Sequence, residues 1–230
     1  MKTDIENNSK IDNAYKNFNY IIEKKLPYKF SYLDKWIFKE SELLIKEARQ
    51  LENKINSPVK NKNKLFRTYQ RGTIVKADFG IGIGSEMSQI HFAIVLNNFD
   101  NPRNNVLTVI PLTSKINKFN LYLGTLIIDL LIKKIQIEFE PISKKINNNI
   151  IINKDEKIKL NNLNNLIIYY KKNIKCTFAC CNLITTISKQ RIFLPENKYD
   201  IIGKARCSNE IMDKIDTEIK KMFTLTHEKK

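Results

Sequence analysis

The stretch RGTIVKADFGIGIGSEMSQIHFAIVLNN, residues 71–98, decides the fold together with VLTVIPLTSK at residues 106–115. Apolar, β-branched runs at residues 74–75, 92–96 and 106–112 are typical of strands. Residues 97–105, which contain Asn101-Pro102, predict a turn between the last two strands. Four of the six glycines of the chain lie within residues 72–84, and three of them, Gly80, Gly82 and Gly84, separate the first two runs. The sequence therefore predicts a β-sheet interrupted by a glycine-rich loop.

Residues 1–66 read as a helical N-terminal extension followed by a polar linker. Apolar side chains recur every three or four residues and predict one face of a helix: Leu33, Trp36, Ile37, Leu43, Leu44, Ala48, Leu51 and Ile55. Ser31 or Asp34 is a candidate cap at its start, and Ser57-Pro58 is expected to end it. The first thirty residues are expected to form a short helix or a loose tail.

Residues 67–230 are expected to form one domain with an insertion at residues 116–175. Within this insertion residues 123–132, 135–139 and 150–152 are candidate strands, and residues 157–170 fit a strand or a helix. Residues 175–186 alternate as a strand does. An amphipathic helix with Ile211, Ile215, Ile219 and Met222 on one face closes the chain, beginning at Ser208. The predicted class is α+β: a helical arm followed by a twisted, largely antiparallel sheet or small barrel.

The charge of the chain favours a polyanionic partner. Lys and Arg total 40 against 24 acidic residues, which gives a formal net charge of +16. Nucleic acid, anionic lipid and an acidic protein all fit such a field. An AT-rich genome is an alternative cause, because the sequence is generally rich in Asn, Ile and Lys.

Cysteine spacing and hydropathy narrow the class further. Cys176, Cys180, Cys181 and Cys207 form no CxxC pair, and only two histidines are present, so no zinc spacing is found. The first twenty residues are polar and do not resemble a signal peptide. The longest apolar stretch, residues 121–132, is too short to cross a bilayer. We therefore expect a soluble, cytoplasmic protein without metal or other cofactor.

Several catalytic motifs are absent. The sequence contains no phosphate-binding GxxxxGK[ST] loop, no dinucleotide fingerprint and no GxSxG elbow. Asp78, Glu86 and Asp100 are scattered, which gives little support to a two-metal nuclease. The glycine-rich loop remains, since its backbone N–H groups can approach a phosphate closely. It leads through Ser85 and Glu86 to His91.

Taken singly, the remaining candidates also have structural explanations. A histidine before an apolar strand is more often a surface or core residue than a catalyst, so His91 alone is a weak signal. Thr113, at the end of the strand 106–112, fits a turn cap equally well. The order in which these features follow one another is more informative.

Four features in order resemble the MazF/PemK family of bacterial toxin–antitoxin toxins. Arg71-Gly72 opens a strand, Gly84-Ser85-Glu86 closes the loop, an apolar strand ends in Asn, and Pro111-Leu112-Thr113-Ser114 follows. ITTISKQRI at residues 184–192 resembles the later strand and turn of the family, and the closing helix fits as well. The resemblance covers residues 71–115 and about 184–222, and not the arm or the insertion.

The resemblance implies a small Src-homology-3-like antiparallel barrel with a C-terminal helix, usually a homodimer. It implies a toxin that acts as a metal-independent endoribonuclease (an mRNA interferase), cleaves single-stranded RNA and is neutralised by a cognate antitoxin. The family's central arginine and threonine fall on His91 and Thr113. Histidine titrates near neutral pH and can donate or accept a proton, unlike arginine, so His91 is expected to be the general acid or base.

The same resemblance assigns roles to neighbouring residues. Thr113 is expected to hydrogen-bond the scissile phosphate, helped by amides near Gly84 and Ser85, and Glu86 is either the complementary base or the residue that orients the loop. Lys115, Lys189 and Arg191 are candidate RNA contacts, each weak and salt-dependent. Two positions where the family often places Arg and Asp are Thr185 and Ser188 here, which points to a weaker or differently specific enzyme.

Two alternatives remain open. One is a catalytically degenerate module that binds RNA or a partner, and the other is a gyrase-targeting toxin of the same fold, against which the positive charge argues. The N-terminal helix either packs its apolar stripe on the barrel or on a second subunit, or enlarges or covers the RNA groove. Aromatic residues at its start are candidates for base stacking, although core packing is commoner for such residues: Tyr28, Phe30, Tyr32 and Trp36.

Overall fold

The computed structural model describes residues 2–56, 65–173, 176–196 and 199–224, and within it the chain divides into two compact units. The first unit combines Met1–Lys64 with Phe79–Ile90, and the second combines Leu65–Asp78 with His91–Lys230. The glycine-rich loop is therefore grouped with the N-terminal segment, although it connects two strands of the second unit. Each unit is described separately below. No helix in the described parts of the chain is long and apolar enough to span a bilayer.

The first unit consists of helices and the loop. The helix α1 runs over Lys2–Glu23, the 3-10 helix η1 over Tyr28–Tyr32 and the helix α2 over Leu33–Asn56. The helix predicted from the apolar spacing at residues 33–55 is confirmed. Of its two candidate caps, Ser31 donates its hydroxyl to the carbonyl of Tyr28, and Asp34 lies in the first turn of the helix. The expected stop at Ser57-Pro58 lies outside the described residues.

The apolar stripe of α2 is only partly covered. Leu33 is buried at the start of the helix, whereas Leu44, Leu51 and Ile55, from its middle onward, are exposed. This exposure is a property of the single chain, and the function of the stripe stays a prediction.

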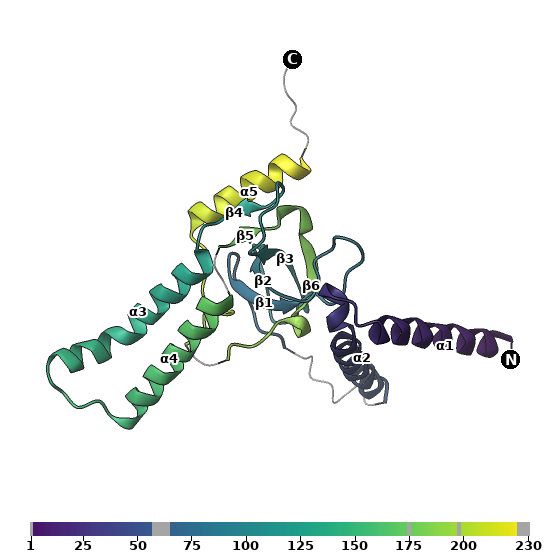
Figure 1. Cartoon of the computed structure of the whole chain (residues 1–230), viewed down its shortest axis with the longest axis horizontal. Helices are drawn as coiled ribbons and strands as arrows, with labels where there is room; N and C mark the ends of the chain where they lie inside the picture. Colours follow the sequence, from purple (N-terminus) through teal and green to yellow (C-terminus); the bar gives the residue numbers. More distant parts are fainter. Residues whose placement is uncertain (1, 57–64, 174–175, 197–198, 225–230) are drawn as a thin grey trace, which may run out of the picture. The chain divides into compact units, whose positions relative to one another are not determined.

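The second unit is built around an antiparallel sheet. Its strands are β1 (Ile74–Asp78), β2 (Ile90–Val95), β3 (Val106–Thr113), β4 (Leu121–Tyr122), β5 (Phe178–Ala179) and β6 (Thr185–Ser188). They follow the order β1-β2-β3-β5-β4, with β6 also on β3 (Figure 1). The three predicted strands of the motif region are confirmed as β1, β2 and β3. The single strand expected at residues 175–186 is instead β5, the 3-10 helix η3 (Cys181–Leu183) and the start of β6.

The sheet is not closed into the predicted barrel. The link from the C-terminal segment to β1 consists of two isolated bridges, Thr73 with Arg206 and Ala77 with Ile192. Among the described residues these bridges do not extend into a paired strand at that edge, so the arrangement is an α+β sheet and the barrel is not confirmed.

The strands expected inside the insertion were wrong. Residues 126–147 form the helix α3 (Leu126–Asn147) and residues 154–173 form α4 (Lys154–Asn173), which lie side by side as a hairpin in Figure 1. Leu131 of α3 and Leu166 of α4 are buried in the same apolar cluster, so packing overrides the strand preference of the isoleucines. The expected strand at 150–152 is the connection, and Asn153 and Glu156 form a reciprocal capping box at the start of α4.

The core joins the sheet to the helices. Ile94 of β2, Ile110 of β3 and Tyr170 of α4 are fully buried in one cluster with Ile215 of the C-terminal helix α5 (Asn209–Phe223). The predicted cap of α5 is confirmed, since the hydroxyl of Ser208 accepts from the amide of Ile211. The ends of β2 and β3 are thereby held on a rigid support.

Candidate active site at the paired ends of β2 and β3

His91 and Thr113 lie at the same end of two neighbouring strands of the second unit. The last pair of the β2–β3 register at this end is Ala93 with Pro111. His91 lies two residues before Ala93 on β2, and Thr113 lies two residues after Pro111 on β3. The two residues that the sequence singled out in separate strands are therefore brought to one end of the strand pair.

The imidazole of His91 is oriented by the backbone of β3. Its Nδ1 lies 3.1 Å from the carbonyl oxygen of Leu112. A carbonyl oxygen only accepts, so Nδ1 carries the proton and donates it to this bond. In the neutral ring the lone pair is then on Nε2, which makes Nε2 the atom that exchanges a proton.

The hydroxyl of Thr113 lies at the beginning of a tight turn. Its Oγ1 accepts from the amide of Lys115 at 3.2 Å, and the hydroxyl proton is available for donation to another acceptor. Thr113 is half-buried and Lys115 is exposed. The carbonyl of Lys115 accepts from the side chain of Asn120, which holds the turn. The end of β3 thus presents a fixed hydroxyl with an exposed lysine two residues later.

Pro111 fits this strand because of where it falls in the ladder. The carbonyl of Pro111 accepts from the amide of Cys180, so the backbone N and O atoms of Pro111 face β5 rather than β2. Proline has no N–H to donate, and the missing donor falls at the end of the β3–β5 pair, because β5 ends at Ala179. The motif Pro111-Leu112-Thr113 is accommodated without loss of a hydrogen bond to β2.

The loop of the first unit contains Gly84, Ser85 and Glu86, all of them exposed. The carboxylate of Glu86 accepts from the amide of Ile83 at 2.8 Å, and the amide of Glu86 donates to the carbonyl of Ile83. These bonds fit the loop-orienting role for Glu86, one of the two roles left open. Gly84 has a φ of +59°, a left-handed conformation that favours glycine.

The predicted phosphate contact of Lys189 does not fit its surroundings. Its side chain is 2% exposed, and Nζ pairs with the 1% exposed carboxylate of Asp100 at 2.7 Å. Nζ also donates to the carbonyl of Asn101. The lysine therefore anchors the turn between β2 and β3, and we leave it out of the proposed RNA contacts. Arg191 is half-buried at the end of the 3-10 helix η4 (Lys189–Arg191).

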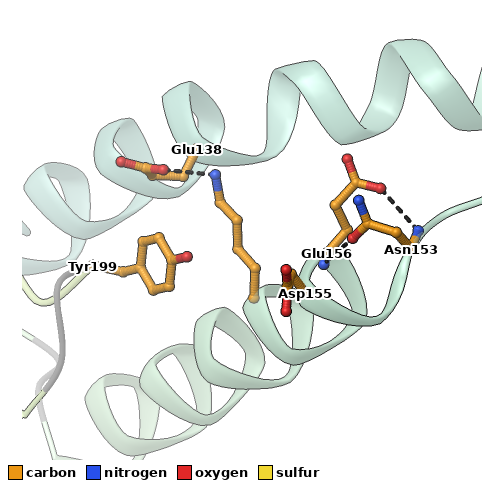
Figure 2. Close-up of a pocket in the computed structure, with 6 residues that line it drawn as sticks. Glu138, Asn153, Asp155, Glu156 and Tyr199 are labelled. Atoms are coloured by element: carbon orange, nitrogen blue, oxygen red, sulfur yellow. Dashed lines mark hydrogen bonds and ion pairs between the residues drawn. The ribbon is translucent and has the colours of Figure 1, made fainter.

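The second unit also contains a cavity that none of the predicted site residues lines. A cavity of about 370 Å³ lies between α3 and α4, lined by Glu138, Asn153, Asp155, Glu156, Lys159 and Tyr199 (Figure 2). Hydrogen bonds from Lys134 and Lys159 lower the pKa of Glu138 to about 2. The ion pair of Glu138 with Lys159 joins α3 to α4, so the cavity is explained by the structure of the hairpin.

Metal and thiol chemistry find little support in the described residues. Within residues 2–56, 65–173, 176–196 and 199–224, no group of three or more His, Cys, Asp or Glu is arranged to hold a metal ion. Burial raises the pKa of Cys180 and Cys181 to about 11 and that of Cys207 to about 12. These thiols are protonated at neutral pH and are poor nucleophiles.

Sequence reasoning did not predict the contacts of two structural residues. The guanidinium of Arg71, which opens the first motif, donates to the carbonyl of Leu96 and pairs with Asp216 of α5. Lys29 contacts the glycine-rich loop of its own unit. Nothing in the sequence distinguishes Lys29 among the many lysines of the N-terminal segment, and only the fold reveals its partners.

Residues 70–131 match the family described as "PemK-like, MazF-like toxin of type II toxin-antitoxin system". The resemblance that the motifs indicated is confirmed over this stretch, which includes β1, the loop, β2 and β3 with His91 and Thr113. Lys189, Arg191, the N-terminal helices and most of the α3–α4 hairpin lie outside it. The chain is thus similar to toxins of type II toxin–antitoxin systems, a class that implies an antitoxin as partner. A search of curated proteins found no match.

Proposed function

We propose that the chain is the toxin of a type II toxin–antitoxin pair and that it cleaves single-stranded RNA without a metal ion. The observation that supports this best is the placement of His91 and Thr113 at one end of the β2–β3 pair, with the imidazole of His91 oriented through Nδ1 to the carbonyl of Leu112. A nitrogen that can exchange a proton and a hydroxyl donor at one strand end suit a reaction in which a phosphate must be held while protons move.

In the proposed reaction the 2′-oxygen of the RNA attacks the adjacent phosphorus while the bond from phosphorus to the 5′-oxygen breaks. The 2′-hydroxyl loses a proton, the leaving 5′-oxygen gains one, and the products carry a 2′,3′-cyclic phosphate and a 5′-hydroxyl. Nε2 of His91 accepts the first proton or, when protonated, donates the second. Thr113 donates its hydroxyl to a non-bridging phosphate oxygen, where negative charge develops.

The loop residues complete the proposal. Amides of Gly84 and Ser85 are further donors to the phosphate, and Glu86 is either the complementary base or the residue that orients the loop. Its bond from the amide of Ile83 supports the second role. Lys115 and Arg191 are proposed to contact neighbouring phosphates, in line with the net charge of +16. A homodimer and an antitoxin that occupies the RNA groove are part of the same proposal.

The test is cleavage of a mixed-sequence single-stranded RNA in EDTA, with wild-type protein beside His91→Ala and analysis of the product ends. Cyclic phosphate and 5′-hydroxyl ends that are lost in the variant would support both the reaction and the residue. RNA binding without cleavage by the wild-type protein would indicate a degenerate binding module. Inhibition of gyrase without RNA binding would indicate a protein-targeting toxin. Cleavage that requires a divalent metal would contradict the mechanism.

A further inference from the structure

The glycine-rich loop is held by the N-terminal segment of its own unit. Nζ of Lys29 donates to the carbonyl oxygens of Gly82 at 2.8 Å and Gly84 at 3.0 Å. The side-chain amide of Gln89 donates to the carbonyl of Tyr28 at 3.2 Å. The ammonium group of Lys29 therefore bridges two carbonyls in the middle of the loop, and the bond from Gln89 to Tyr28 adds a contact near the end of the loop.

The indole of Trp36 lies against the beginning of the same loop. A Cβ atom at Gly80 would be 2.6 Å from Nε1 of Trp36, closer than packed atoms approach. Gly80 also has a φ of +72°. The absence of a side chain at this position is thus what allows the α2 tryptophan to contact the loop backbone.

The backbone is strained both in the N-terminal segment and in the loop where the two contact each other. Tyr28 and Gln89, the two partners of the side-chain bond, have φ values of +62° and +71°, in the left-handed region that non-glycine residues rarely adopt. Such conformations persist where surrounding contacts determine them. The loop also has bonds of its own, from Phe79 to Gln89 and from Gln89 to Gly80 at its base.

The lysine contact determines which way the loop amides point. In a trans peptide the carbonyl and the N–H point in opposite directions. The carbonyl of Gly82 points to Lys29, and the N–H of the same peptide, on Ile83, donates to Glu86. By the same geometry, the N–H of Ser85 points away from Lys29, because the carbonyl of Gly84 faces the ammonium.

We propose that Lys29 is a positioning residue for RNA cleavage: by binding the carbonyls of Gly82 and Gly84, it fixes the direction of the Ser85 amide, the donor to which the proposed function assigns a phosphate contact. The ammonium also polarises the Gly84–Ser85 peptide and strengthens its N–H as a donor. This inference rests on the proposed function. It gives the N-terminal extension a part in the reaction, although the extension lies outside the family match.

The test compares Lys29→Met, Lys29→Arg and Lys46→Met. Lys46 is exposed on α2, so its variant removes the same charge from the same unit. We expect Lys29→Met to lower kcat by about 10-fold, with little change in KM. This loss is smaller than the roughly 100- to 1000-fold loss that follows removal of such a donor altogether, because Lys29 acts only through the orientation of the donor. Lys29→Arg, which retains donors for two carbonyls, is expected to keep most of the activity, and Lys46→Met to match wild type.

A phosphorothioate substrate separates positioning from general loss of stability. Sulfur at one non-bridging position of the scissile phosphate accepts a hydrogen bond poorly, so wild-type protein is expected to cleave the two diastereomers at different rates. In Lys29→Met the ratio of these rates is expected to shift from the wild-type value, because the Ser85 amide is no longer aimed at its oxygen while the Thr113 hydroxyl still donates to the phosphate. An unchanged ratio together with wild-type kcat would overturn the inference. A raised KM and a smaller salt dependence at unchanged kcat would also overturn it, since Lys29 would then contact RNA directly.

Hydrogen exchange of the free protein keeps this inference distinct from the proposed function. We expect Lys29→Met to accelerate exchange of amides in residues 79–90, including Ile83, while residues 106–113 exchange as in wild type. If wild-type protein cleaves no RNA, the proposed function and the catalytic part of this inference both fall, whatever the exchange shows. If wild type cleaves and Lys29→Met leaves both exchange and kcat unchanged, the inference alone falls.

Discussion

The imidazole of His91 donates through Nδ1 to the carbonyl of Leu112, the residue immediately before Thr113. This bond ties the ring on β2 to the backbone of β3 and leaves the lone pair of the neutral ring on Nε2. The register of the same two strands brings His91 and Thr113 to one end of the pair. The geometry of the candidate site is thus carried by a strand pair in the core of the second unit.

Replacement of His91 is expected to abolish most of the activity. His91→Ala should lower kcat by about 100-fold or more, the range for loss of a general acid or base. The pH dependence of cleavage between about pH 5 and 8, where imidazole titrates, should disappear in the variant. The measurement is a pH–rate profile of both proteins on one RNA oligonucleotide. Wild-type activity in His91→Ala would remove this residue from the mechanism.

Replacement of Thr113 should separate its hydroxyl from its shape. Thr113→Val keeps the branched side chain but loses the donor, and we expect a fall in kcat of about 10-fold or more, as for other donors to a developing anion. Thr113→Ser is the matched control that retains the hydroxyl. Because the hydrogen bond from the amide of Lys115 is also lost, a stability cost of about 1 kcal/mol is expected in Thr113→Val. Equal activity of the two variants would argue for a turn-capping role alone.

The buried pair of Lys189 and Asp100 predicts a loss of stability rather than of RNA affinity. Lys189→Met leaves a buried carboxylate without its partner, which typically costs about 3–5 kcal/mol of unfolding free energy. Urea denaturation measures this cost. Lys115→Gln serves as the comparison, because Lys115 is exposed. Its replacement should reduce the slope of log K for RNA binding against log salt concentration by about one and should hardly change stability. A stable Lys189→Met protein with weakened RNA binding would restore the sequence-based assignment of Lys189.

The helical hairpin should lose stability in acid through Glu138. Its pKa is lowered to about 2 in the folded chain by hydrogen bonds from Lys134 and Lys159, whereas an unperturbed glutamate titrates near 4.3. A lowered folded pKa contributes stability that is present above the unfolded pKa and is lost as the pH falls through the folded one.

Urea denaturation of wild type and Glu138→Gln between pH 7 and 2 tests this contribution. The difference between the two proteins should be largest near neutral pH and should shrink from about pH 5 toward pH 2. Glu140→Gln is the matched control on the same helix, because Glu140 pairs with Lys144 in an exposed position and should contribute little. A gap between wild type and Glu138→Gln that is independent of pH would show that packing, not charge, is responsible.

Local chemistry determined what the sequence by itself revealed. Strands β1, β2 and β3, the helix α2 and the capped start of α5 were predicted because β-branched runs, apolar periodicity and a serine cap act over a few residues. The order of the motifs also predicted the family resemblance, and the choice of His91 and Thr113 as central residues, which follows from that resemblance, stays a prediction. These inferences needed only neighbours along the chain.

Tertiary structure decided the rest, because it depends on contacts between distant residues. The isoleucine-rich insertion became the helices α3 and α4 since their buried faces pack in a shared core, which local strand preference does not report. Lys189 changed from a candidate RNA contact to a buried anchor when the fold brought Asp100 to it. Lys29 reached the carbonyls of Gly82 and Gly84 across more than fifty intervening residues, and only folding of the first unit makes those atoms neighbours.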